Sequence, residues 1–298
     1  MSSTCIIETH ELTKRYGSFE AVCSLNLRVN SHRITGFLGR NGAGKSTTIK
    51  MLLGMTHPTA GAGVVLGKSI NNPKENREMR REVAYVGEDK QLYAYMTVQQ
   101  LIRFTKSFYP DWQRDVEHRL LQQYGLPLDR KVKALSKGMR TKLALLLALS
   151  RRPALLILDE PSEGLDPVSI EELLQALIAA AADGTTVFFS SHQIAEVERI
   201  AEHVCIIDRG KLVMDVSLDD MRQDYRRITL GFTQEQPREK FRIQGIQQIQ
   251  TSGRQVVLLA NQNADAILEL ARSMEPVSID ISAVGLREVF LETVKEAR

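Results

Sequence analysis

The sequence predicts an α/β fold, in which a parallel sheet has helices on both faces and is followed by a smaller α+β domain. Up to about residue 215, short and continuously apolar segments alternate with amphipathic helical segments, and after residue 227 this order changes. Strands that are apolar along their whole length are typical of parallel sheets, because both of their faces are buried. The 298 residues are 43% hydrophobic and 25% charged, which is typical of a globular protein and excludes a wholly disordered chain.

The elements of the first domain follow from local patterns. Apolar runs rich in β-branched and aromatic residues predict the sheet strands, at residues 33–38, 83–86, 155–158, 185–189 and 204–208. Apolar residues spaced three and four apart predict amphipathic helices over 98–108 and 170–181. The segment from about residue 89 to 152 contains successive helical patterns without a strand, so we interpret it as a helical insert between two strands.

The C-terminal segment predicts a second, smaller domain. A polar stretch at residues 217–227 separates it from the first, so we expect domains at residues 1–217 and 228–298. The expected strands are at 228–232, 244–250, 255–260 and 277–281, and the expected helices are near 237–241, over 264–272 and over 286–294. The order βαββαβ predicts a ferredoxin-like unit.

Charge and cysteine content narrow the function classes. Lys plus Arg is 39 and Asp plus Glu is 36, and the resulting net charge of +3 is too small for a dedicated nucleic-acid binder. Cys5, Cys23 and Cys205 have no metal-binding spacing and indicate buried thiols in a reducing compartment. The apolar runs are shorter than the ~20 residues of a membrane-spanning helix, and the N-terminus lacks the pattern of a signal peptide. We therefore expect a cytoplasmic protein.

A glycine-rich loop follows the first of these sheet strands. Residues 39–47 read G-R-N-G-A-G-K-S-T, which matches G-x-x-x-x-G-K-[ST] between a strand and a helix. Glycines let the backbone turn its N–H groups onto phosphate oxygens, and the N-terminus of the following helix adds a partial positive charge. The lysine of this pattern reaches the β- and γ-phosphates, and the hydroxyl after it binds Mg²⁺. The predicted nucleotide-binding residues are Gly39, Asn41, Gly42, Ala43, Gly44, Lys45, Ser46 and Thr47.

Two carboxylates, Asp159 and Glu160, follow the strand at residues 155–158. An unpaired buried charge is costly, so a buried strand that ends in two acids requires partners for them. Beside a phosphate loop, these partners are a metal ion and water. We expect Asp159 to bind Mg²⁺ together with Ser46, and Glu160 to polarise the water that attacks the γ-phosphate.

Three further motifs follow a fixed order: L-S-K-G-M at residues 135–139, P-S-E-G-L-D-P at 161–167, and S-S-H at 190–192 after a strand. With the phosphate loop and the paired acids, they make residues 5–215 resemble the ATP-binding cassette (ABC) family of transporter ATPases, most closely its export branch. The resemblance implies an ABC-type P-loop nucleotide-binding domain with a mixed sheet and a helical insert. The tail at 228–298 then reads as a small α+β appendage.

The resemblance also implies roles for single residues. Tyr16 matches the aromatic residue that stacks on adenine. Ser136 and Gly138 match the signature loop, which contacts the γ-phosphate held by the opposite subunit through a hydroxyl and a helix N-terminus. Asp166 matches the loop that links the two sites across the dimer, and His192 matches the switch histidine that contacts the γ-phosphate.

The sequence departs from the family's motifs at two places. The signature loop reads LSKGM rather than the commoner LSGGQ, although the contacting residues Ser136 and Gly138 are kept. Glu88 stands where the family usually has a glutamine that binds Mg²⁺, with Gln91 as a weaker candidate for that role. A carboxylate also binds Mg²⁺, but its repulsion of a γ-phosphate 4 Å away is on the order of 1–4 kcal/mol before the metal screens it.

The function implied by the resemblance is ATP hydrolysis that drives transport. Two cassettes, either two copies of this chain or one copy and a paralogue, close head to tail around two ATP molecules with Mg²⁺, and Lys45, Glu160 and His192 are the catalytic groups. The helical insert contacts a separate integral membrane permease, which places the protein on the inner face of the cell membrane. No nucleic-acid partner is expected.

Other hypotheses remain open at this stage. A cassette that acts on ribosomes or DNA usually has two cassettes in one chain or a long coiled-coil insert, and neither feature is present here. A regulator that binds ATP without hydrolysis would be distinguished by an ATPase assay. A phosphate-loop kinase or GTPase is disfavoured by the signature loop and by the lack of an N-K-x-D motif.

Overall fold

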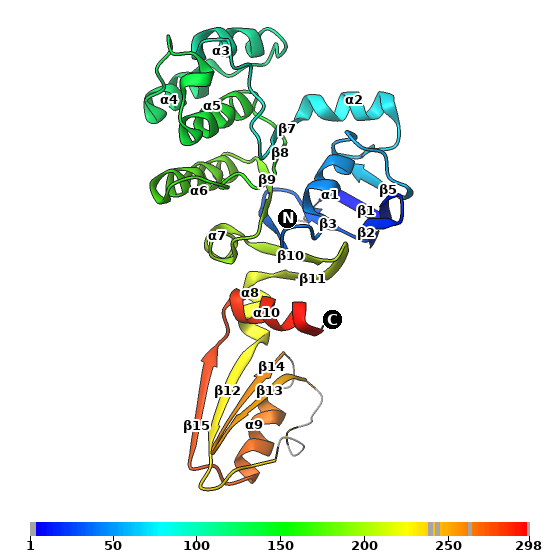
Figure 1. Ribbon diagram of the computed structural model, residues 1–298, viewed down its shortest axis with the longest axis vertical. Coiled ribbons are helices and arrows are strands. Elements are labelled where there is room, and N and C mark those ends of the chain that lie inside the picture. Colours follow the sequence, from blue (N-terminus) through cyan, green and yellow to red (C-terminus); the bar gives the residue numbers. More distant parts are fainter. Residues whose placement is uncertain (1–3, 238–240, 242–244, 262–263, 297–298) are drawn as a thin grey trace. The chain divides into compact units, whose positions relative to one another are not determined.

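The computed structural model describes residues 4–237, 241, 245–261 and 264–296. It divides into two compact units, residues 1–215 and 216–298 (Figure 1). The first unit contains the phosphate loop and every other motif identified in the sequence.

A central sheet organises the first unit, in the strand order β11-β10-β4-β9-β8-β7. Neighbouring strands from β10 to β7 pair in parallel, which confirms the predicted parallel sheet. The strands are β4 (Ile34–Leu38), β7 (Val83–Val86), β8 (Leu155–Leu158), β9 (Thr186–Ser191), β10 (His203–Asp208) and β11 (Lys211–Ser217). The carboxyl ends of β4, β8 and β9 meet at one edge of the sheet, so the loops that follow them build one site.

A second, antiparallel sheet makes the fold mixed, as the resemblance implied. Its order is β2-β1-β5-β6, and β3 also pairs with β1. The strands are β1 (Cys5–Tyr16), β2 (Phe19–Leu25), β3 (Arg28–Asn30), β5 (Ala60–Val65) and β6 (Lys68–Ser69). Side chains of both sheets and of the first helix form one core, in which the rings of Phe37 and Phe188 lie 5.4 Å apart. This core fixes the strand that leads into the phosphate loop.

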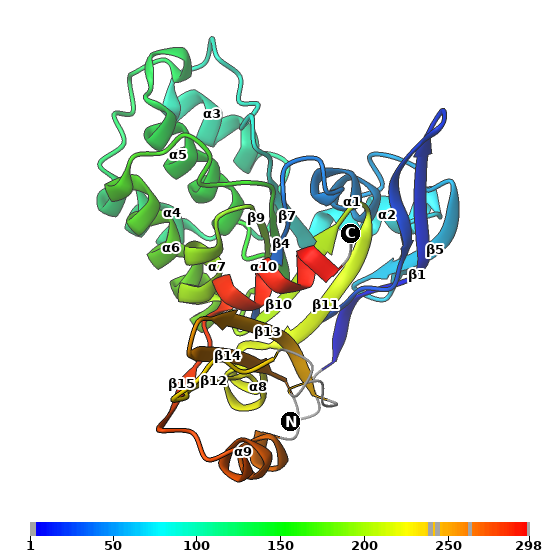
Figure 2. The same ribbon diagram turned by 60° about the horizontal axis from the view of Figure 1, so that its bottom comes forward.

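Helices of the first unit cover the central sheet and form the insert. They are α1 (Lys45–Leu52), α2 (Pro73–Glu82), α3 (Val98–Lys106), α4 (Arg114–Tyr124), a 3₁₀ turn (Val132–Ala134), α5 (Lys137–Leu149), α6 (Pro167–Ala182) and α7 (Ile194–Ile200). Helices α3, α4 and α5 group beside the sheet in both views (Figures 1 and 2), which is the predicted helical insert between β7 and β8. Helix α3 begins with a capping box between Thr97 and Gln100.

The apolar stripes of two predicted helices are only partly buried. Leu173, Leu174 and Leu177 of α6 are buried as expected, whereas Ile178 is exposed. The predicted helix over 98–108 ends as α3 at Lys106, and Phe108 after it is 63% exposed. Burial therefore stops before the end of the apolar pattern, and the insert keeps apolar side chains at its surface.

The second unit contains a sheet in the order β13-β14-β12-β15, with antiparallel neighbours. Its elements are α8 (Leu218–Asp224), β12 (Arg226–Gly231), β13 (Ile246–Ser252), β14 (Gln255–Ala260), α9 (Ala264–Ser273), β15 (Ser278–Ala283) and α10 (Leu286–Glu296). The helix expected near 237–241 falls mostly outside the described residues, so the ferredoxin-like assignment stays a prediction.

The polar stretch expected as a separator is instead structured. Ser217 caps α8, since its Oγ accepts from the Asp220 N–H at 3.0 Å, and Leu218 and Met221 bury their side chains. Two apolar residues at helical spacing were enough to bury one face, while the polar residues between them face solvent.

Candidate nucleotide-binding site

The phosphate loop joins β4 to α1, and its glycines are required by close backbone packing. Gly44 precedes α1 with φ of 109°, and a Cβ there would lie 2.4 Å from the Ala21 carbonyl oxygen. A Cβ on Gly39 would lie 2.5 Å from the Ile207 carbonyl oxygen. Only glycine fits at these two positions, so the loop can turn and present the N-terminus of α1 to an anion.

Lys45 is almost fully buried and has three oxygen partners. Its Nζ donates to the carbonyl oxygens of Gly39 at 2.7 Å and Arg40 at 3.1 Å. The same Nζ lies 3.0 Å from Oε1 of Glu160, with both side chains less than a tenth exposed. A buried ammonium group is stable only when it is paired, so these contacts hold the lysine between the loop and the end of β8.

Asp159 connects the loop to β9. Its Oδ1 accepts from Ser46 Oγ at 3.1 Å and from Ser190 Oγ at 2.8 Å. Ser190 Oγ also accepts from the Glu160 backbone N–H at 2.9 Å, so one hydroxyl fixes both residues of the acidic pair. Sequence reasoning gave Ser190 no role, although its place two residues before His192 at the end of a strand is a local signal.

The buried Glu160 pairs with His192, which is partly exposed. His192 Nδ1 lies 2.8 Å from Glu160 Oε2, and Glu160 has a left-handed φ of 45°. A non-glycine residue pays for that conformation with strain of order 1–3 kcal/mol, and such strain persists where surrounding contacts hold it. The Ser190 hydrogen bond to the Glu160 N–H and the contacts of its carboxylate with Lys45 and His192 supply that restraint.

Glu196 of α7 ties together the loops that carry this pair. Its Oε2 accepts from Ser162 Oγ at 2.7 Å and from Ser191 Oγ at 3.0 Å, and the side chain is buried. Burial, and to a smaller extent the charge of Glu160, raises the pKa of Glu196, which the two serine hydrogen bonds partly oppose. The carboxyl group of Glu196 therefore holds Ser162, in the loop after Glu160, at a fixed distance from Ser191, which precedes His192.

These groups surround a cavity of about 380 Å³. Its lining combines the loop with Glu160 and the histidine: Phe19, Ala21, Asn41, Gly42, Gly44, Lys45, Ser46, Thr47, Glu88, Glu160, Glu163 and His192. A neighbouring cavity of about 440 Å³ is lined by Ser46, Asp159 and Glu88 together with Tyr85. Burial, aided by the charge of Asp159, raises the pKa of Tyr85 to about 12, so the phenol stays neutral beside the acids.

Comparison with known proteins identifies the family of this chain. A family model described as ABC transporter matches residues 22–163. The chain is 38% identical over 225 residues to the bacitracin transport ATP-binding protein BcrA of Bacillus licheniformis, and this alignment covers 74% of the chain and 73% of that protein. The chain belongs to the ABC transporter family.

Two more similarities define how far the family resemblance extends. The ABC transporter ATP-binding protein YtrB of Bacillus subtilis (strain 168) is 25% identical over 287 residues, which cover 96% of the chain and 97% of that protein. A solved ATP-binding subunit of an ABC transporter matches 73% of the chain and 92% of its own length, with a TM-score of 0.66 and 30% identity. The cassette is therefore the ATP-binding subunit of an ABC transporter, an ATPase coupled to transport. Among the described residues, no helix has the length and apolar character to cross a membrane.

The signature loop of the cassette lies outside the phosphate-loop cavity. Ser136 is the exposed N-cap of α5, and its Oγ accepts from the Met139 N–H at 3.2 Å. A Cβ on Gly138 would lie 2.6 Å from Ser169 Oγ, so a side chain here would displace the hydroxyl that donates to Asp166. Neither Ser136 nor Gly138 lines the cavity that contains Lys45.

Asp166, of the motif at residues 161–167, caps α6. Its carboxylate accepts from the hydroxyl and the N–H of Ser169, and these hydrogen bonds lower the pKa of Asp166.

The aromatic residue at the cavity of the cassette is Phe19 rather than Tyr16. Tyr16 pairs with Phe19 across the β1–β2 turn, is half exposed, and has Lys14 Nζ 5.1 Å from its ring centre. Phe19 is 62% exposed and lines the cavity, whereas Tyr16 does not. Sequence reasoning missed Phe19, which lies three residues after Tyr16 at the same turn.

The two departures from the family's motifs meet at one small cavity of about 140 Å³. Its lining residues are Glu88, Asp89, Lys90, Lys137 and Arg140. Lys90 is buried and its Nζ lacks a hydrogen-bond partner among the described residues; burial, together with the charge of Lys137, lowers the pKa of Lys90 to about 8. The extra carboxylate of Glu88 therefore faces cations from its own loop and from the signature loop.

The oxygen donors of the cassette fit a magnesium ion. Ser46 Oγ and Asp159 Oδ1 are 3.1 Å apart, close to the about 2.9 Å that separates adjacent ligands in octahedral magnesium. Glu88 lines the same cavity as both and supplies a further hard oxygen donor.

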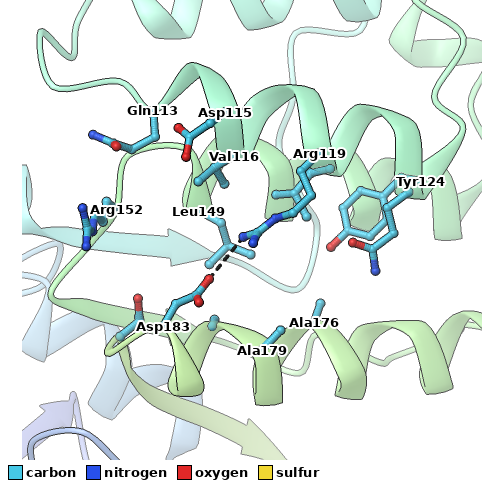
Figure 3. Close-up of a pocket in the computed structure, with 14 residues that line it drawn as sticks. Gln113, Asp115, Val116, Arg119, Tyr124, Leu149, Arg152, Ala176, Ala179 and Asp183 are labelled. Carbon is cyan, nitrogen blue, oxygen red and sulfur yellow. Dashed lines mark hydrogen bonds and ion pairs between the residues drawn. The ribbon is translucent and has the colours of Figure 1, made fainter.

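A further cavity of about 440 Å³ lies between α4 and α6, away from the phosphate loop (Figure 3). Arg119 and Asp183 form an ion pair of 3.1 Å across it, and both side chains are more than half exposed. Exposed pairs of this kind stabilise by at most ~1 kcal/mol. None of the site residues predicted from the sequence lines this cavity.

Proposed function

We propose that two such cassettes close head to tail around two ATP molecules and drive export through a separate membrane permease. One observation carries the proposal: the phosphate loop, Glu160 and His192 converge in one cavity, while Ser136 at the N-terminus of α5 lies outside it. A hydroxyl beside a helix N-terminus is a phosphate-binding arrangement, and a second cassette brings a phosphate to it.

The residues of the site have different roles in hydrolysis. The N-terminus of α1 and Lys45 bind the phosphates and neutralise the charge that develops on them. Glu160 accepts the proton of the attacking water, and His192, in contact with Glu160 at 2.8 Å, orients that carboxylate. Ser46, Asp159 and Glu88 would hold Mg²⁺, which would supply charge stabilisation at the β- and γ-phosphates.

ATP binding and hydrolysis then alternate two states of the dimer. ATP stabilises the closed state because it contacts Lys45 of one chain and Ser136 of the other. Hydrolysis removes the γ-phosphate that joins the chains, and the closed state loses its advantage. The coupling to transport therefore follows from a difference in affinity between two states.

An aromatic cluster on the insert is the proposed permease contact. Tyr93, Tyr95, Phe104 and Phe108 pack with ring centres 5.0–6.0 Å apart, and each is more than a third exposed. Contiguous exposed aromatics are typical of protein interfaces. The similarity to a bacitracin transport subunit supports the export branch for this chain.

Dimer closure is tested with Glu160→Gln, which is expected to bind ATP but to hydrolyse it slowly. Size-exclusion chromatography with light scattering is expected to show the mass of two chains with ATP and Mg²⁺, and of one chain with ADP. A monomer under both conditions would contradict the proposal.

The permease contact is tested with the double variant Phe104→Ser and Phe108→Ser. It is expected to keep the ATP-driven dimer and to lose co-purification with the permease, whereas Val277→Ser, also highly exposed, keeps both.

A further inference from the structure

Three metal-ligating side chains converge on β10 and β11, away from the nucleotide site. His203 Nε2 lies 2.5 Å from Asp215 Oδ1, and Cys205 Sγ lies 3.5 Å from the same oxygen. All three donor atoms lie within 4.8 Å of one another. An imidazole, a thiol and a carboxylate in one place are the donor types that bind zinc.

The sheet explains why these residues meet. His203 and Cys205 are two apart on β10, so their side chains leave the same face of the strand. Asp215 lies on β11, which neighbours β10 in the sheet. Donors that are held by paired strands are more rigid than donors on loops, which favours a defined metal geometry.

The spacing of the donors is close to that of a tetrahedral zinc site. With Zn–S near 2.3 Å and Zn–N and Zn–O near 2.0–2.1 Å, tetrahedral angles place sulfur and oxygen about 3.6 Å apart and nitrogen and oxygen about 3.3 Å apart. The observed sulfur–oxygen distance of 3.5 Å matches, whereas the nitrogen–oxygen distance of 2.5 Å is that of a hydrogen bond and would lengthen by about 0.8 Å on metal binding.

Access from solvent is available on one side of the cluster. The side chains of His203 and Asp215 are 20% and 35% exposed, whereas Cys205 is fully buried. Burial was predicted for all three cysteines, but Cys5 is exposed and Cys23 is only partly buried. The buried sulfur thus forms the floor of the site, and the two partly exposed donors form its rim. A water molecule can complete four-coordination from the exposed side, as in zinc sites with three protein ligands.

We propose that His203, Cys205 and Asp215 bind one zinc ion, with a water molecule as the fourth ligand. The ion joins β10 to β11 and stabilises the first unit by mass action, because the three donors are brought together only in the folded chain. This site is independent of the proposed ATP cycle.

Cobalt(II) is the probe that tests the site, because a thiolate ligand gives it a charge-transfer absorption that oxygen and nitrogen ligands do not give. The full chain without nucleotide is expected to develop this band and the intense visible bands of four-coordinate cobalt, saturating at one equivalent, and zinc is expected to displace them. Cobalt held by Glu160, Glu163 and His192 at the nucleotide site gives no such band, since that cluster lacks sulfur.

Matched variants assign the ligands. Cys205→Ser is expected to lose the charge-transfer band, whereas Cys23→Ser, which removes another free cysteine, keeps it. Asp215→Asn and His203→Gln keep the core intact and are expected to weaken cobalt affinity by at least about tenfold. The proposal is overturned if the wild-type chain shows no charge-transfer band, if the band is lost in Cys23→Ser, or if both rim variants bind cobalt as tightly as the wild type.

Discussion

The two halves of the proposed ATP site differ in how completely one chain builds them. Lys45, Asp159 and Glu160 are buried, and each contacts another group of the same cavity. Ser136 is exposed, and the contact described for its hydroxyl is the Met139 N–H of its own helix turn. A group that must act on a phosphate held by the same chain is fixed by that chain, whereas a group that acts on a partner's phosphate is left at the surface.

The largest effect is expected where the buried half performs chemistry. Glu160→Gln removes the general base and keeps the shape of the side chain, so turnover is expected to fall by about 10²–10⁴-fold. ATP affinity is expected to stay within about twofold, because the loss of a base affects the transition state and not the ground state. Phosphate release and equilibrium nucleotide binding measure the two quantities. Normal turnover would remove Glu160 from this role.

Variants of Lys45 and Ser136 compare the two halves of the proposed ATP site. Lys45→Ala is expected to abolish measurable ATP binding by the single chain. Ser136→Ala removes a hydrogen bond to a charged group of roughly 1.5–3 kcal/mol, so turnover is expected to fall about 10–100-fold while ATP affinity of the monomer is unchanged. A monomer whose ATP affinity drops in Ser136→Ala would place the signature loop in the same half as Lys45.

A smaller effect on kcat is expected from Glu196, which holds the segments that carry Glu160 and His192. Glu196→Ala removes the shared acceptor of Ser162 and Ser191, so Glu160 and His192 lose their spacing and kcat is expected to fall about tenfold. KM for ATP is expected to stay unchanged, since the phosphate loop is untouched. Glu196→Gln keeps an acceptor oxygen and is expected to restore most of the activity. Equal kcat in both variants and in the wild type would leave Glu196 without a positioning role.

The smallest effect is on stability and depends on pH. Burial raises the pKa of Glu196, so the folded chain holds its proton to higher pH than the unfolded chain does. Unfolding then releases a proton, and this residue reduces stability increasingly as pH rises through the ordinary pKa of a glutamate. Glu196→Gln is expected to raise Tm at pH 8 by about 2–4 °C, which corresponds to roughly 1 kcal/mol, and to have little effect at pH 4. The same shift at both pH values would contradict this account.

The features that the sequence predicted correctly are those determined by residues close together in the chain. The central strands, the phosphate loop and the pair Asp159–Glu160 are local patterns, and the structure contains the strands close to their expected bounds. Ser190 and Glu196 were missed because Glu160 and Ser162, which they contact, lie 30 and 34 residues away from them in the chain. The cysteine spacing gave no metal signal, since His203, Cys205 and Asp215 meet only across two paired strands.

The central claim is that each ATP is held by the phosphate loop of one chain and the signature loop of another. Mixing two inactive variants tests it most directly: Lys45→Ala, which lacks the first half, and Ser136→Asp, which keeps a good helix cap but places a negative charge against the γ-phosphate. In a mixed dimer, one site contains the intact Lys45 of one chain and the intact Ser136 of the other. ATPase activity is therefore expected to appear on mixing, above that of either variant alone. Two variants that stay inactive together would contradict a site shared between chains.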